Sequence, residues 1–97
     1  MSLLKFAVSP GRILKDEFLA PLGLSAGALA KALDVPRTRI ERIVSEDTSV
    51  SVDTALRLAA YFRTSPNLWL NLQTNYDLAT ADTSVTAGIT PHPDIAA

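Results

Sequence analysis

The fold is decided by one stretch of the sequence, residues 25–44, which reads SAGALAKALDVPRTRIERIV. Its first residue, Ser25, can accept a hydrogen bond from a free backbone N–H at the start of a helix. Apolar residues follow with the i, i+3, i+4, i+7 spacing of one helix face: Ala26, Leu29, Ala30 and Leu33. Asp34-Val35-Pro36 then interrupts the pattern, because Pro36 disfavours helical geometry at Val35 and suits the start of a new helix. The stretch therefore predicts two short helices, about 26–33 and 37–44, joined by a tight turn.

Two short helices joined in this way, the second one bearing arginines, indicate a helix-turn-helix unit. Ala30 is small enough for the second helix to cross the first at that point, and Asp34 tolerates the left-handed backbone that such a turn requires. Besides Ala30, the residues predicted to fill the angle between the two helices are Leu29, Leu33, Val35, Ile40 and Ile43. The pattern alone does not distinguish this unit from any other corner of two helices.

Three further helices are predicted around this pair. The first begins after Ser9-Pro10-Gly11, ends near Pro21 and Gly23, and has the predicted buried face Ile13, Leu14 and Phe18. Another begins after the cap Ser51, and its predicted buried stripe is Val52, Ala55, Leu56, Ala59 and Phe62. The last begins at Ser65-Pro66 and carries Leu68, Trp69, Leu72 and Tyr76 at helical spacing. We therefore predict an all-α fold of about five short helices without strands.

The last of these helices is apolar on two sides, because Leu70 and Leu78 lie off its main stripe. We expect one side to pack on the domain and the other on a second copy of the chain, as in a two-fold symmetric dimer. Leu68, Trp69, Leu72 and Tyr76 are accordingly assigned to core or dimer packing. For Trp69 packing is favoured over a role in ligand binding, since aromatic residues at this spacing usually belong to a core.

The domain boundaries follow from where the helical periodicity begins and ends. Residues 10–78 form one predicted domain, with an N-terminal extension at 1–9 and a tail at 79–97. The tail is rich in Ala, Thr, Ser, Asp and Pro and has few large apolar residues. We expect it to be disordered when free, because it cannot bury enough apolar surface to offset the entropy of ordering.

Composition excludes several classes of protein. The chain of 97 residues is 47% hydrophobic and 20% charged, which is ordinary for a globular domain. It has no cysteine and one histidine, so neither a disulfide scaffold nor a thiolate or histidine metal site is expected. We find no nucleophile–base pair and no cofactor motif, and we expect no enzyme activity. No apolar run approaches the roughly 18 residues of a membrane span, so we expect a cytoplasmic protein. The net charge of −1 requires any nucleic-acid surface to be a local patch.

Five segments of the chain together match a known family in the same order. Residues 10–19, 21–25, 53–58 and 64–66 read PGRILKDEFL, PLGLS, DTALRL and TSP, and residues 68–78 read LWLNLQTNYDL. They resemble the HigA/VapI-type antitoxins, a branch of the Xre/Cro-like (lambda-repressor-like) helix-turn-helix proteins. The match covers roughly residues 10–78, and the Trp-Leu-Asn-Leu-Gln block is its specific part. The resemblance implies a homodimeric repressor that binds the operator of its own operon and neutralises a RelE-like (HigB-type) mRNA-cleaving toxin.

The resemblance also implies which residues contact DNA. Residues 37–44 lie where the family has its recognition helix, so Arg37, Thr38 and Arg42 would face base edges in the major groove. Arginine suits guanine, because its planar fork matches the O6 and N7 acceptors together. Arg39 points more to the side and is better placed for a phosphate.

Two departures from the family pattern keep other functions open. Relatives often begin the first helix of the motif with Gln, where this chain has Ala26. Their loop after the recognition helix is usually rich in Gly, Lys and Arg, whereas here residues 45–49 read SEDTS, with Glu46 and Asp47 expected to repel phosphates. The alternatives are a stand-alone Xre-family regulator without a toxin and a protein-interaction module that has lost DNA binding. In the latter case the arginines would be only a solvated helix face.

Overall fold

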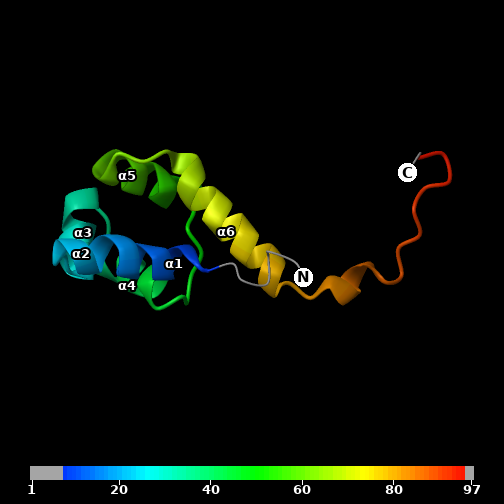
Figure 1. The fold of residues 1–97 in the computed structure, drawn as a ribbon, viewed down its shortest axis with the longest axis horizontal. Helices are drawn as coiled ribbons and strands as arrows, with labels where there is room; N and C mark the ends of the chain where they lie inside the picture. Colours follow the sequence, from blue (N-terminus) through cyan, green and yellow to red (C-terminus); the bar gives the residue numbers. More distant parts are fainter. Residues whose placement is uncertain (1–7, 96–97) are drawn as a thin grey trace.

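The computed structural model describes residues 8–95 of the chain. In these residues the protein is all-helical and contains no strand, as predicted. The first three segments, α1 (Pro10–Ile13), η2 (Leu14–Leu19) and α2 (Ala20–Leu22), follow one another without a break. They are followed by α3 (Ala26–Leu33), α4 (Arg37–Val44), α5 (Val52–Phe62) and α6 (Pro66–Thr80). Figure 1 shows the first segments gathered with α3 and α4, α5 lying across them, and α6 running out of this body towards the tail.

The first helical run contains a π-helical turn, which the sequence pattern did not predict. In η2 the backbone follows the wider π spacing, and the N–H of Ala20 donates to the carbonyl of Lys15, five residues earlier. This spacing turns Leu14 and Leu19 to the same side, and both are buried, whereas Phe18 is only half-buried. The helix passes Pro21 and ends at Leu22, where Gly23 adopts the left-handed conformation with φ of 60°.

The central helix pair has the bounds predicted from its caps and turn. The Ser25 side chain accepts a hydrogen bond from the N–H of Ala28 at 3.0 Å, and Asp34 ends α3 in the left-handed conformation with φ of 58°. Between the two helices the structure buries five of the six predicted residues, Leu29, Ala30, Leu33, Ile40 and Ile43, and half-buries Val35. These residues form one cluster with Leu14, Leu58 and Trp69.

The buried face of α5 differs from the predicted stripe. Ala55, Leu58 and Ala59 are buried, whereas Val52 is 61% exposed and Leu56 is 54% exposed. One residue advances about 100° around a helix, so Leu56 lies beyond the edge of the arc that Ala55 and Leu58 share. Sequence spacing gave a plausible stripe but not the side on which the neighbouring helices lie.

Helix α6 is capped by the Ser65 side chain, which accepts from the N–H of Leu68 at 3.1 Å. It carries Trp69 into the core with no exposed surface. The indole N–H donates to the Thr64 hydroxyl at 2.9 Å, and the ring lies 5.1 Å from that of Phe18, centroid to centroid. Leu72 and Tyr76 are half-buried and Leu68 is 39% exposed, so only Trp69 of the four predicted packing residues lies fully inside the domain.

Gln73 on α6 is buried, although its polar side chain gave no sign of this in the sequence. Its Oε1 accepts from the N–H of Val50 at 2.8 Å, and its Nε2 donates to Asp77 Oδ1 at 2.8 Å. A buried backbone N–H without a partner is costly, so Gln73 supplies the acceptor that the loop before α5 lacks. This bond fastens the loop after α4 to the last helix.

The two ends of the chain differ from the predicted boundaries. Helix α6 continues to Thr80 rather than ending at Leu78, and residues 81–95 are exposed, with one short turn, η3 (Thr83–Thr86). That these residues are disordered in solution stays a prediction. Of the predicted N-terminal extension, residues 1–7 lie outside the described residues. Ser9 belongs to the body, because its side chain caps α1 and is buried.

Candidate nucleic-acid interface

Helix α4 presents a polar face to solvent opposite its buried residues. Ile40 and Ile43 face the core, while Thr38, Glu41 and Arg42 are exposed on the other side. Pro36 occupies the N-cap position without a side-chain hydrogen bond, so the backbone N–H groups of the first turn lack a side-chain partner there. The helix can therefore approach another molecule with its N-terminal turn and its exposed face.

Arg37 extends over α3 from the first turn of α4. Its side chain is 72% exposed and its Nε lies 3.3 Å from Glu41 Oε2, one helical turn away. Its aliphatic part passes close to Gly27, where an added Cβ would lie 3.4 Å from Arg37 Cδ. An exposed pair of this kind is weak, so Glu41 can release Arg37 to a phosphate or a base at small cost.

Arg42 is exposed in the last turn of α4, and within residues 8–95 its guanidinium forms no ion pair. Its backbone is fixed, because the Arg42 carbonyl accepts from the N–H of Asp47 at 2.8 Å and from the Ser45 hydroxyl at 3.2 Å. A fixed backbone with an uncommitted guanidinium is well suited to bidentate recognition of an acceptor pair.

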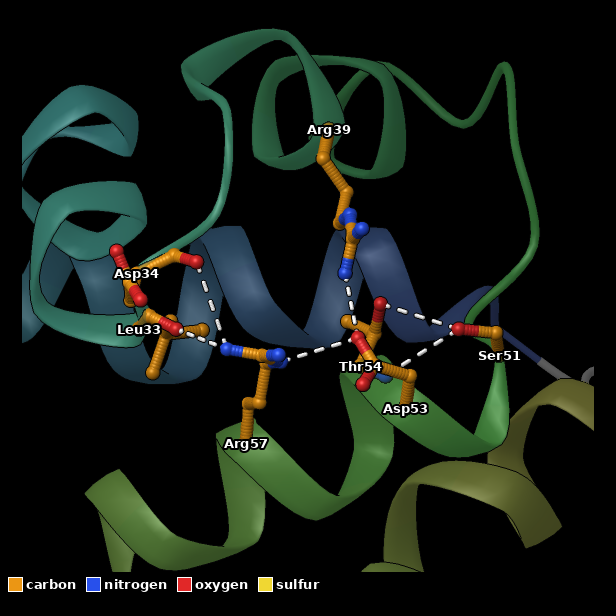
Figure 2. A network of polar contacts seen from close by, with 7 residues as sticks. All are labelled: Leu33, Asp34, Arg39, Ser51, Asp53, Thr54 and Arg57. Atoms are coloured by element: carbon orange, nitrogen blue, oxygen red, sulfur yellow. Dashed lines mark hydrogen bonds and ion pairs between the residues drawn. The ribbon is translucent and has the colours of Figure 1, made fainter.

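Arg39, which we expected to face a phosphate, instead lies against α5 (Figure 2). Its Nη1 is 2.6 Å from Asp53 Oδ2, and the Nε of Arg57 lies 3.0 Å from the same oxygen. Arg57 Nη1 also donates to the carbonyls of Leu33 at 2.8 Å and Asp34 at 3.4 Å. A phosphate contact by Arg39 stays a prediction, and it would require Arg39 to leave Asp53.

The charge of Asp53 is favoured by this arrangement. Hydrogen bonds from Arg39 and from Arg57 hold the pKa of the Asp53 carboxyl below its ordinary value of 3.8. The carboxylate is therefore ionised at neutral pH, and the contribution of these bonds to stability is lost only as the pH falls through the lowered pKa. In the sequence, Asp53 is recognisable as an acidic residue in the first turn of the helix that Ser51 caps, where the helix dipole favours an anion. Its i, i+4 spacing to Arg57 was a usable signal, whereas the contact with Arg39 was not visible.

The acidic loop after α4 is held by its own carboxylates. Glu46 accepts a hydrogen bond from the Ser9 hydroxyl, and its backbone is left-handed with φ of 67°. Asp47 Oδ2 accepts from the Ser45 hydroxyl at 2.8 Å. Both acidic side chains remain exposed, so the expected repulsion of phosphates stays a prediction. Their hydrogen bonds give them a second role, in shaping the loop.

A metal site and a membrane span are both absent from residues 8–95. No group of three or more His, Asp or Glu side chains there could hold a metal ion. No helix in this part of the chain is long and apolar enough to cross a membrane.

Comparison with known proteins places these elements among DNA-binding folds. A sequence model of the helix-turn-helix family matches residues 14–69. The chain is 54% identical to virulence-associated protein I of Dichelobacter nodosus, over 78% of this chain and 70% of that one. The structure resembles Pseudomonas aeruginosa antitoxin HigA, solved with the higBA promoter, with a TM-score of 0.80, 40% identity and coverage of 92% and 99% of the two chains. Antitoxin GraA in complex with its operator gives a TM-score of 0.81 at 40% identity, over 88% and 90%.

Proposed function

This chain belongs to the helix-turn-helix family, in its HigA/VapI-type antitoxin branch. On that basis we propose that it represses its own operon by binding operator DNA. We also propose that it neutralises a RelE-like (HigB-type) toxin. The observation that carries the DNA-binding part is the exposed face of α4, with Thr38 and with Arg42, which has no ion pair within residues 8–95. This face lies on a fold shared with antitoxins solved on promoter or operator DNA. We propose that α4 is the recognition helix.

In this proposal α4 enters the major groove with its exposed face. Arg42 and, once released from Glu41, Arg37 donate to guanine O6 and N7, and Thr38 makes a smaller contact with one base. Because DNA affinity depends on phosphate contacts while specificity depends on base contacts, these three residues determine which operator is chosen.

We further propose that the protein acts as a homodimer. Two copies related by a two-fold axis would present two α4 helices about 34 Å apart, one turn of B-DNA, and would read a palindromic operator. Leu68 and Leu78 on α6 remain exposed in the single chain, and they are available for a second copy.

Replacing Arg42 with alanine is expected to weaken binding to the promoter of the protein's own operon by about 1–3 kcal/mol and binding to random duplex much less, because a base contact carries the sequence discrimination. Arg37→Ala should act in the same direction. Mobility shifts on both duplexes at two salt concentrations measure the effect.

The matched control for these variants is Arg12→Ala. Arg12 is exposed on α1 and pairs with Asp16 one turn away, as Arg37 pairs with Glu41, so the same charge and the same kind of ion pair are lost from a helix other than α4. This variant should keep the preference for the promoter. A wild-type protein that binds promoter and random DNA equally would refute the repressor function and favour the interaction-module alternative.

The antitoxin part of the proposal predicts a partner encoded beside this gene. Expression of a small, basic, RelE-like reading frame immediately upstream should arrest growth on its own, and co-expression of this chain should restore growth by occupying the toxin. A colony count with and without co-expression measures the rescue. Absence of such a reading frame, or of rescue, would leave the stand-alone regulator as the better description.

A further inference from the structure

One carboxylate oxygen joins the recognition helix to the two helices around it. Asp53 Oδ2, in the first turn of α5, accepts from Arg39 on α4 and from Arg57 on α5. Arg57 continues the chain of bonds to the carbonyls of Leu33 and Asp34, at the end of α3 and in the turn that leads to α4. Figure 2 shows this continuous path from Arg39 through Asp53 and Arg57 to the turn.

The charges in this path also suit the helix ends they meet. Asp53 lies in the first turn of α5, where the helix dipole favours an anion. Arg57 reaches carbonyl groups that α3 leaves without partners at its C-terminal end, where the dipole favours a cation. The helix dipoles at the start of α5 and at the end of α3 therefore both favour the hydrogen bonds of this path.

The contribution of this path to stability is nevertheless small. The side chains of Arg39 and Arg57 are each 39% exposed and that of Asp53 is 54% exposed, and ion pairs so open to solvent add little to the free energy of unfolding. The path instead restricts the orientation of α4 relative to α5. The contacts that hold α4 through Ile40 and Ile43 are apolar and non-directional, whereas hydrogen bonds restrict both distance and angle.

On the basis of the proposed DNA binding, we propose that Asp53 is a positioning residue for operator recognition. It holds Arg39 on the flank of α4 and thereby fixes the rotation of that helix about its own axis, so that Thr38 and Arg42 face the groove together. Asp53 acts through Arg39 and contacts no DNA itself. The rival mechanism is competition, in which Arg39 leaves Asp53 for a phosphate and the carboxylate only hinders binding.

The test is Asp53→Asn, which keeps the shape of the side chain and removes its charge. We expect the ratio of promoter affinity to random-duplex affinity to fall about tenfold, as is usual for residues coupled in one network. Affinity for random duplex should hold or rise, because a negative charge has been removed. The thermal midpoint should change little, which separates positioning from a loss of folding. Competition predicts the opposite result: tighter binding to both duplexes with an unchanged ratio.

The matched control is Asp82→Asn. Asp82 is exposed, its pKa is also held below the ordinary value by hydrogen bonds, first from the Ser84 hydroxyl, and it lies in the tail. The variant changes the net charge equally and should leave the ratio unchanged. An equal fall of the ratio in both variants would overturn the inference, because net charge would then explain it.

A double-mutant cycle with Arg39→Gln completes the test. If Asp53 acts through Arg39, the ratio in the double variant should be no lower than in the single variants, whereas independent roles would make the two effects add. Additive effects would overturn the inference and leave the repressor function intact. A wild-type protein without promoter preference would overturn both.

Discussion

Replacing Trp69 with alanine is expected to lower the free energy of unfolding by about 3–5 kcal/mol. The side chain is fully buried, contacts the rings of Phe18 and Phe62, and donates to Thr64, so its loss leaves a cavity and a hydroxyl without its donor. A domain of this size has a total stability of roughly 5–15 kcal/mol, so the variant should lose a large fraction of it. Urea unfolding followed by circular dichroism measures the loss.

Two further variants test whether the loss of stability comes from the buried indole of Trp69. Trp69→Phe keeps one six-membered aromatic ring in the core but removes the five-membered ring of the indole together with its N–H, so it should leave a smaller cavity and cost less than the alanine variant. Tyr61→Ala removes an aromatic residue that is exposed on α5 and should cost about 1 kcal/mol at most. Equal losses in the free energy of unfolding for Trp69→Ala and Tyr61→Ala would contradict the burial of Trp69 in the core. Helix α6 would then contribute to dimer contacts more than to the core of the single chain.

The sequence was sufficient for the central helix pair because its signals are local. Ser25 caps the helix that directly follows it, and Asp34 adopts the left-handed turn that ends it. Each needs only residues within one helical turn, and the same holds for the caps Ser51 and Ser65. The bounds of α3 and α4 could therefore be predicted from the sequence.

Features that depend on distant parts of the chain were not predictable in this way. The buried face of α5 includes Leu58 and excludes Leu56, because the side on which the neighbouring helices lie decides it. The π turn of η2 lies in a segment whose residues also fit an ordinary helix. Gln73 is buried because the N–H of Val50, 23 residues away, needs an acceptor.

The same limit applies to the candidate interface. The exposed arginines of α4 follow from helical spacing, which is a local property. The engagement of Arg39 depends on Asp53, 14 residues later on another helix, and that of Glu46 depends on Ser9, 37 residues earlier. The sequence was therefore sufficient to identify α4 as the helix with exposed arginines. The structure was needed to show that Arg39 is paired with Asp53 on α5.

Gly11 is the glycine at which an added methyl group should displace α4 most. On Gly11 an added Cβ would lie 1.8 Å from the backbone carbonyl oxygen of Ile43 and 2.8 Å from its carbon. The neighbouring atoms are backbone of α4, so they cannot turn aside as a flexible side chain would. Helix α1, which lies beside α4 in Figure 1, would have to move away from it.

Gly11→Ala is therefore expected to cost about 3 kcal/mol or more, the upper end of the range for an overpacked core. The sign of the change in unfolding free energy distinguishes a crowded from an uncrowded position, because alanine at an uncrowded helix position stabilises a protein by up to about 1 kcal/mol relative to glycine. Gly88→Ala, where nothing lies within 4 Å, is the control and should leave the thermal midpoint unchanged. Any Gly11→Ala protein that still folds should also lose its promoter preference, because the displaced backbone belongs to α4. A thermal midpoint at or above that of the wild type would show that α1 and α4 are not in contact at this point.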